Sequence, residues 1–113
     1  MTVTKDLIAA SATPLILSIL SESESYGYAI IKRVHELSGG QMQWTDGMLY
    51  PVLHRLEKQK LIQSRWTESE SGRKRKYYKI KKNGIKALNE HKNQWNIVYT
   101  ALKQLWENKP CLT

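Results

Sequence analysis

The spacing of the apolar residues changes in the middle of the chain, and this change restricts the fold strongly. Apolar residues recur at the spacing of one face of a helix at Leu49, Val52, Leu53 and Leu56. From residue 61 apolar and polar residues alternate instead. A Glu-Ser-Gly segment at 70–72 is typical of a turn between two strands, 61–68 and 73–80. The sequence therefore predicts a helix that leads directly into a β-hairpin.

Three more helices are predicted around this unit. The first runs from Leu7 to about Leu20, and Pro14 either bends it or restarts it behind a Thr13 cap. The second covers about 26–37 and the last covers 83–107. The order of three helices, a two-stranded hairpin and a long helix is that of a winged helix-turn-helix with a C-terminal extension, a mainly α (α+β) fold.

Positive charge is concentrated in the middle third of the chain. The net charge is +8, and residues 41–82 account for +7 of it, with eleven basic and four acidic side chains. Basic residues often serve solubility alone. Their concentration in one segment favours a polyanion as partner, and nucleic acid is the commonest candidate.

The third helix carries candidate DNA contacts. Thr45 is its expected N-cap, and the helix is expected to continue past Pro51 because the apolar stripe does. The major groove of double-stranded DNA accepts one α-helix, which reads bases near its N-terminal half and meets phosphates further along. The candidate contacts on this helix are Thr45, Gly47, Met48, Tyr50, His54, Arg55 and Lys58. The alternative interpretation is an ordinary solvated helix face.

Four adjacent cations follow the turn of the hairpin: Arg73, Lys74, Arg75 and Lys76. Alternation along a strand places Arg73 and Arg75 on one face and Lys74 and Lys76 on the other. Their mutual repulsion favours a partner that relieves it, although charge runs are often only solvated. A wing of this kind typically follows the DNA backbone or enters a minor groove.

The last helix has an aromatic and apolar seam at spacings of three and four: Ile85, Leu88, Lys92, Trp95, Tyr99, Leu102 and Trp106, widened by Val98 and Leu105. The first helix has almost no polar face and needs more cover than one short chain offers. Both features predict a homodimer. Its expected interface residues are Leu15, Ile19, Leu88, Trp95, Tyr99, Leu102 and Trp106. The predicted division is a DNA-binding domain, 1–82, with its wing at 61–81, and a dimerisation helix with a tail, 83–113.

Other function classes find little support in the sequence. The three histidines are widely separated, and there is no phosphate-binding loop or nucleophile–base pair, so no enzyme, cofactor or metal site is predicted. The N-terminus lacks the pattern of a signal peptide, and the apolar run 14–20 is too short to cross a membrane. A lone cysteine, Cys111, forms no intrachain disulfide. These features predict a cytoplasmic protein without a membrane partner.

Four stretches together resemble the PadR family of bacterial transcription regulators: 26–31 (YGYAII), 47–57 (GMLYPVLHRLE), 72–78 (GRKRKYY) and 82–84 (KNG). The single helix at the C-terminus is similar to the smaller subfamily. The resemblance implies a homodimeric repressor on a palindromic operator, with the third helix in the major groove and the wing on the backbone. It gives DNA-contact roles to Tyr50, to the wing cations 73–76 and to Thr45, while Met48 stands where many members have Ser or Thr.

The resemblance also implies that a small aromatic effector, phenolic or planar, releases the repressor. Trp95 matches a tryptophan that stacks on flat drugs in the multidrug-sensing branch, and Tyr99 and Ser18 complete the predicted effector site. Pro14 and Tyr99 depart from that branch in ways that would narrow such a pocket. The alternative function is a small-molecule binding protein centred on Trp95. Two further alternatives stay open: Trp95 as ordinary packing, and a winged helix that contacts only proteins.

Overall fold

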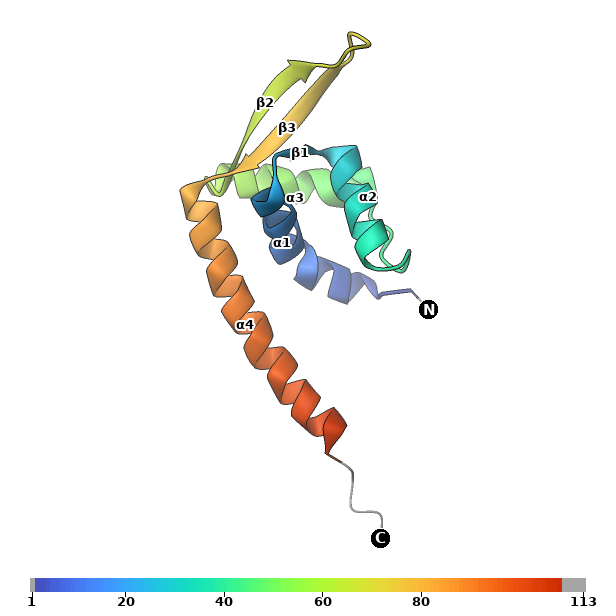
Figure 1. Cartoon of the computed structure of the whole chain (residues 1–113), viewed down its shortest axis with the longest axis vertical. Helices are drawn as coiled ribbons and strands as arrows, with labels where there is room; N and C mark the ends of the chain where they lie inside the picture. Colours follow the sequence, from blue (N-terminus) through green and yellow to red (C-terminus); the bar gives the residue numbers. More distant parts are fainter. Residues whose placement is uncertain (1, 109–113) are drawn as a thin grey trace.

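The computed structural model describes residues 2–108, in seven elements. Their order is α1 (Lys5–Glu22), β1 (Ser25–Tyr26), α2 (Gly27–Leu37), α3 (Asp46–Lys58), β2 (Ile62–Glu68), β3 (Lys74–Ile80) and α4 (Lys82–Glu107). This order confirms the mainly helical winged helix-turn-helix fold with a long C-terminal helix (Figure 1). The prediction about Cys111 lies outside the described residues.

Helix α1 continues through its proline. Thr4 caps it, with Oγ1 accepting a hydrogen bond from the backbone N–H of Leu7 at 3.3 Å. Of the two alternatives predicted for Pro14, a bend or a restart behind Thr13, the restart is wrong, because Thr13 lies inside the helix. Buried side chains lie on both sides of Pro14: Ala12, Ile16, Leu17, Ile19 and Leu20. Their burial outweighs the one backbone hydrogen bond that the proline removes.

Helix α3 begins as predicted. Thr45 is its N-cap, and Oγ1 accepts a hydrogen bond from the backbone N–H of Met48 at 3.2 Å. Pro51 lies inside the helix, which continues because apolar side chains before and after it reach the core. These buried side chains are Leu49, Leu53 and Leu56.

The hairpin forms two thirds of a three-stranded antiparallel sheet with the order β1-β3-β2. Gly72 in its turn has φ 81°, a left-handed conformation that favours glycine. The return strand begins at Lys74, one residue later than predicted. The unpredicted β1 adds two residues beside β3, with Tyr26 opposite Tyr77. This short strand ties the start of α2 to the wing.

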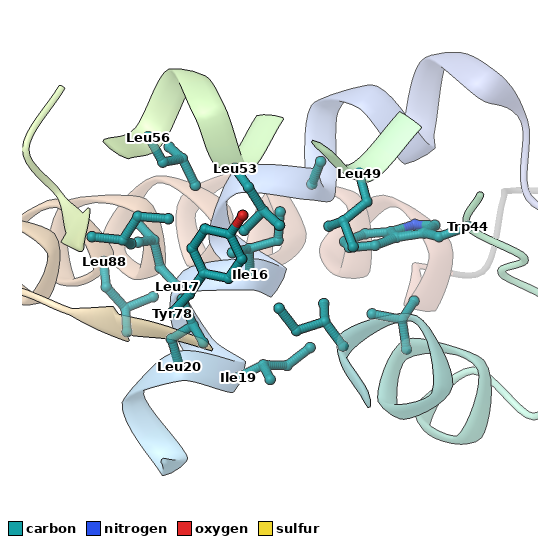
Figure 2. Packing of buried hydrophobic residues seen from close by; sticks show 14 residues of the cluster. Ile16, Leu17, Ile19, Leu20, Trp44, Leu49, Leu53, Leu56, Tyr78 and Leu88 are labelled. Atoms are coloured by element: carbon teal, nitrogen blue, oxygen red, sulfur yellow. The ribbon is translucent and has the colours of Figure 1, made fainter. Parts of the chain in front are cut away.

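Helix α1 lies at the centre of the core and contacts α2, α3, β3 and α4. Figure 2 shows side chains from these elements meeting around it, among them Ile16, Leu17, Leu53, Tyr78 and Leu88. Two of the predicted dimer contacts are buried within one subunit. Ile19 is 6% exposed and Leu88 is 3% exposed, because the core of one subunit already covers them. They have almost no surface left for a partner.

Helix α4 packs against the body only near its beginning. A Cβ atom on Gly84 would overlap the carbonyl oxygen of Leu61, so glycine allows this helix to start close against the base of the hairpin. Leu88 is its last buried residue, and every described residue after His91 is exposed. The helix therefore projects from the body, as Figure 1 shows, and gives the molecule an extent of 68 × 31 × 21 Å.

Candidate nucleic-acid interface

A groove of about 670 Å³ lies between the hairpin on one side and α3 with the start of α2 on the other. Its lining residues are Tyr26, Gly27, Tyr28, Tyr50, His54, Trp66, Arg73, Lys74, Arg75, Lys76 and Tyr78. Six of them were predicted as DNA contacts, two on the helix and four on the wing. The fold brings these two predicted groups, some 20 residues apart in the sequence, to one basic surface.

Tyr50 reaches the groove by packing against the start of α2. A Cβ atom on Gly27 would overlap the Tyr50 hydroxyl group, so glycine makes room for the ring. Tyr50 still exposes 45% of its surface. Its phenol group is thus held in place by protein contacts while part of it stays accessible to a ligand in the groove.

The residues at the beginning of α3 do not line this groove. The Thr45 hydroxyl oxygen accepts the capping hydrogen bond, and Met48 is half-buried against the core. Gly47 is exposed, and only the Thr45 side chain would lie within 4 Å of an added Cβ atom. Thr45 and Met48 therefore have structural roles, and the DNA contacts predicted for all three residues stay predictions.

Two later cations of α3 also lie outside the groove. Nη2 of Arg55 donates a hydrogen bond to Oγ1 of Thr13 in α1 at 2.9 Å, so this guanidinium group links two helices. Lys58 is exposed in the last turn of α3. Both side chains are accessible to solvent, and their predicted phosphate contacts stay predictions.

Lys76 is held on the groove side of the wing. Its Nζ lies 3.9 Å from Oε1 of Glu57 in α3, and 5.9 Å and 5.7 Å from the ring centroids of Trp66 and Tyr78. Glu57 also accepts a hydrogen bond from the Ser64 hydroxyl in β2. The carboxylate thus fixes the wing to α3 and offsets part of the charge of Lys76.

Arg75 also lines the groove, but its side chain lies against Tyr26 of β1, on the strand face opposite to that of Lys76, as the alternation predicts. Its guanidinium carbon is 4.5 Å from the ring centroid of Tyr26, which in turn lies 5.2 Å from the ring of Tyr77. Arg65 stacks on Tyr77 at 5.6 Å and pairs with Glu24. The guanidinium group of Arg75 therefore already contacts an aromatic ring of the protein, which leaves less of it accessible to a ligand.

The two cations at the tip of the wing, Arg73 and Lys74, are exposed. Within residues 2–108 neither forms a salt bridge. They are the wing charges most available to an anion, whereas Arg75 and Lys76 first have to leave or share contacts inside the protein.

Tyr78 closes the floor of the groove as a neutral group. Burial raises its pKa to about 12, with smaller contributions from the nearby Tyr50 and Glu57. Its hydroxyl stays protonated at neutral pH, so the floor adds no negative charge opposite the cations.

Five lining residues were not predicted as contacts: Tyr26, Gly27, Tyr28, Trp66 and the floor residue Tyr78. The alternation of apolar and polar residues in β2 places Trp66 on the same strand face as Ile62, and this pattern could have indicated that Trp66 faces α3. Its exposure depends on how far the hairpin extends beyond α3, which no local pattern gives. Tyr26 and Tyr28 belong to a strand of two residues and to the first turn of α2, segments too short for a periodic signal.

A second groove, of about 590 Å³, lies between α1 and α4. It is mainly apolar, with lining residues that include Leu7, Pro14, Leu15, Ser18, Leu88 and Trp95. Two of the predicted effector residues, Trp95 and Ser18, lie together here. Tyr99 does not line the groove and stands exposed on α4, one turn further along.

No helix in residues 2–108 is long and apolar enough to cross a membrane. The same residues contain no group of three or more His, Cys, Asp or Glu side chains that could hold a metal ion.

Residues 16–90, from α1 into α4, match the PadR-like family of transcriptional regulators. The chain belongs to this family. The PadR-like assignment confirms the resemblance seen in the four motifs. It also places the chain in a family of transcription regulators, not of enzymes.

Known proteins are similar to the chain in sequence, and solved structures are similar to it in fold. The crystal structure of a PadR-like transcriptional regulator from Bacillus cereus matches with a TM-score of 0.81 at 31% identity, over 93% of this chain and 100% of that one. Protein X of Lysinibacillus sphaericus, which is uncharacterized, is 32% identical over 93 residues, 82% of this chain and 85% of its own length. The transcriptional regulator YqjI of Escherichia coli is 34% identical over 89 residues, 79% of this chain but 41% of YqjI.

Proposed function

We propose that this PadR-like protein is a sequence-specific DNA-binding repressor that acts as a homodimer. The observation that carries the proposal is the groove in which Tyr50 and His54 of α3 lie together with the wing cations 73–76. Duplex DNA at this groove meets an α-helix for its major groove and cations for its phosphates. Its place of action is the cytoplasm, where bacterial DNA lies.

The homodimer is supported by the exposed part of α4. Large apolar side chains are exposed on it: Trp95, Ile97, Val98, Tyr99, Leu102, Leu105 and Trp106. Most of them follow the heptad seam, and a second copy would remove them from water. Two DNA-binding domains joined in this way fit a palindromic operator, whose half-sites repeat at the spacing of the two recognition helices.

Release by a planar aromatic or phenolic effector is the finer part of the proposal. The groove between α1 and α4 supports it, because it is mainly apolar and carries the indole ring of Trp95 beside the Ser18 side chain. Stacking on the ring would supply most of the affinity, and the serine would supply a polar contact. The same groove supports the second candidate function, a small-molecule binding protein.

DNA binding is tested by fluorescence anisotropy with a labelled duplex from the region upstream of the chain's own coding sequence, and with a random duplex of equal length. The upstream duplex is expected to bind about a thousandfold more tightly or better. Arg73→Ala should weaken binding to both duplexes and reduce the salt slope by about 0.9 for one lost phosphate contact. Tyr50→Ala should also reduce the preference between them.

Lys103→Ala is the matched control, because this exposed lysine lies on the far part of α4 outside the groove. The proposal fails if the native protein binds both duplexes equally, or if the wing variant binds as tightly as the native protein. A winged helix that contacts only proteins would sediment free of both duplexes at moderate salt.

The effector is tested with a panel of planar cationic and phenolic compounds. Binding should quench tryptophan emission in the native protein, and Trp95→Ala should lose the quenching while remaining dimeric. Trp66→Phe serves as control, since this tryptophan lies on the wing, outside both this groove and the dimer seam. If a bound compound leaves operator affinity unchanged, the small-molecule binding function is favoured over effector release.

A further inference from the structure

An unpredicted tryptophan stands on the groove side of the wing. In the β2–β3 pairing Trp66 lies opposite Lys76, and along β2 it shares its strand face with Ile62 and Ser64. Ile62 is buried in the core and Ser64 contacts Glu57 of α3, so this face is directed toward the body. Trp66 accordingly lines the groove together with Tyr50.

The position of Trp66 along β2 leaves its ring without protein cover. Ile62, four residues earlier on the same face, is 1% exposed, whereas Trp66 is 66% exposed. Lys76 approaches the ring, with Nζ 5.9 Å from its centroid, but covers only part of it. A large aromatic side chain on an otherwise polar and cationic hairpin contributes little to the core, and its apolar surface is available to a ligand.

The surroundings of the ring indicate the chemistry of that ligand. Lys74 and Lys76 line the same groove as Trp66, and the groove holds two further wing cations. A duplex presents phosphates that match such cations, with apolar deoxyribose and base edges between them. A ring between lysines can therefore contact the apolar part of DNA while its neighbours hold the charged part.

We propose that Trp66 is a DNA-contact residue whose indole ring packs against deoxyribose and base edges of the bound duplex. The proposal rests on the DNA-binding function proposed above and adds an apolar contact to it. The contact distinguishes the wing from a purely electrostatic clamp. Its energy does not depend on released counterions, so salt separates it from the phosphate contacts.

The test compares salt dependence among variants, with the upstream duplex as probe. Trp66→Ala should weaken binding about tenfold and leave the slope of log affinity against log salt unchanged, because no charge is lost. Arg73→Ala should lower the slope. Trp66→Phe should retain most of the affinity. Leu37→Ala is the matched control, an exposed apolar residue at the end of α2 outside the groove, and should bind like the native protein.

Tryptophan emission gives a second readout that survives poor folding of the alanine variant. The duplex should quench part of the emission of the native protein, and this part should be absent in Trp66→Phe. Native-like binding by Trp66→Ala, or undiminished quenching in Trp66→Phe, overturns the role of Trp66 alone. Failure of the native protein to bind any duplex overturns the DNA-binding function instead.

Discussion

Gly84 lies where a side chain would meet backbone. A Cβ atom there would overlap the Leu61 carbonyl oxygen and lie 2.7 Å from the Ile80 side chain. Since a backbone carbonyl cannot swing aside, Gly84→Ala should separate α4 from the hairpin and lower the free energy of unfolding by about 2 kcal/mol. Thermal unfolding at fixed protein concentration measures this loss, which corresponds to a melting temperature lower by roughly 10 °C.

Gly47→Ala is the matched control, because this glycine lies in the exposed first turn of α3 with open space around it. Alanine there should leave stability unchanged or raise it by a few tenths of a kcal/mol. A Gly84→Ala protein that melts with the native one would contradict the close packing of α4 on the hairpin.

Gly27 has a different neighbour, the flexible end of the Tyr50 side chain. In Gly27→Ala the ring can rotate away, so stability should change by less than about 1 kcal/mol. Affinity for the upstream duplex should fall by about as much as we expect for Tyr50→Ala, because the phenol group is no longer held in its position in the groove. In a double-mutant cycle with Tyr50→Ala the two effects should not add. Full additivity would show that Gly27 does not position Tyr50.

At this scale the sequence predicts the kind of residue but not its local partner. Arg75 and Lys76 are adjacent cations with the same predicted role. One stacks on Tyr26 and the other lies near Glu57, and these partners are about 50 and 20 residues away. Contacts across such separations depend on how the elements pack, so a ranking of the wing cations requires the structure.

Among the elements, β1 is joined to the wing by its pairing with β3, and a salt bridge lies beside this pairing. Glu24, just before β1, pairs with Arg65 of β2, and the hydrogen bond from Arg65 lowers the pKa of the Glu24 carboxyl below its usual 4.5. A lowered folded-state pKa means that the pair stabilises the fold above about pH 4.5, and that this contribution is lost as the pH falls below that value.

Urea unfolding between pH 3 and pH 7 checks this dependence. Glu24→Gln should be less stable than the native protein at pH 6 to 7, by a small amount because the pair is exposed, and equally stable near pH 3. Glu90→Gln, on α4, is the control, since no salt bridge of Glu90 is found in residues 2–108. A stability gap that persists at pH 3 would exclude the ion pair as its cause.

The elements themselves were predictable where apolar periodicity ran long enough. The structure confirms the predicted start of α3, and it confirms the hairpin and α4 to within one residue of the predicted bounds, because each carries several periods of its pattern. The restart at Pro14 was wrong because a local rule for proline was outweighed by the apolar residues on both sides of it. The strand β1 was not predicted, because two residues are too few to show an alternation of apolar and polar side chains.

For the whole molecule, the sequence predicted more apolar surface than one subunit can bury. It did not predict which apolar residues lie in the core of the subunit and which remain exposed for an interface. Ile19 of the first helix and Leu88 of the seam were both predicted to lie in the interface, and both are buried in the core of one subunit. Hydrophobicity alone does not separate the core of a subunit from an interface, since both bury the same side chains. In the exposed part of α4, after His91, apolar side chains are not needed for the core of the subunit and are therefore available to an interface.

The two faces of that exposed part allow a direct test of the homodimer. Leu102 lies on the heptad seam, whereas Ile97 projects from another side of α4, and both are exposed. Leu102→Glu should weaken the dimer about a hundredfold or more, because association would bury an unpaired carboxylate. Ile97→Glu adds the same charge outside the seam and should remain dimeric. Sedimentation velocity over a concentration series measures both dissociation constants.

The same pair of variants links assembly to DNA binding. A folded Leu102→Glu monomer keeps its groove and wing, so its binding to a random duplex should change little. Its affinity for the upstream duplex should fall toward that of a single half-site, because the second domain is no longer attached. If Leu102→Glu stays dimeric and Ile97→Glu does not, the copies meet through the other face of α4, and the seam would then be free for a different contact.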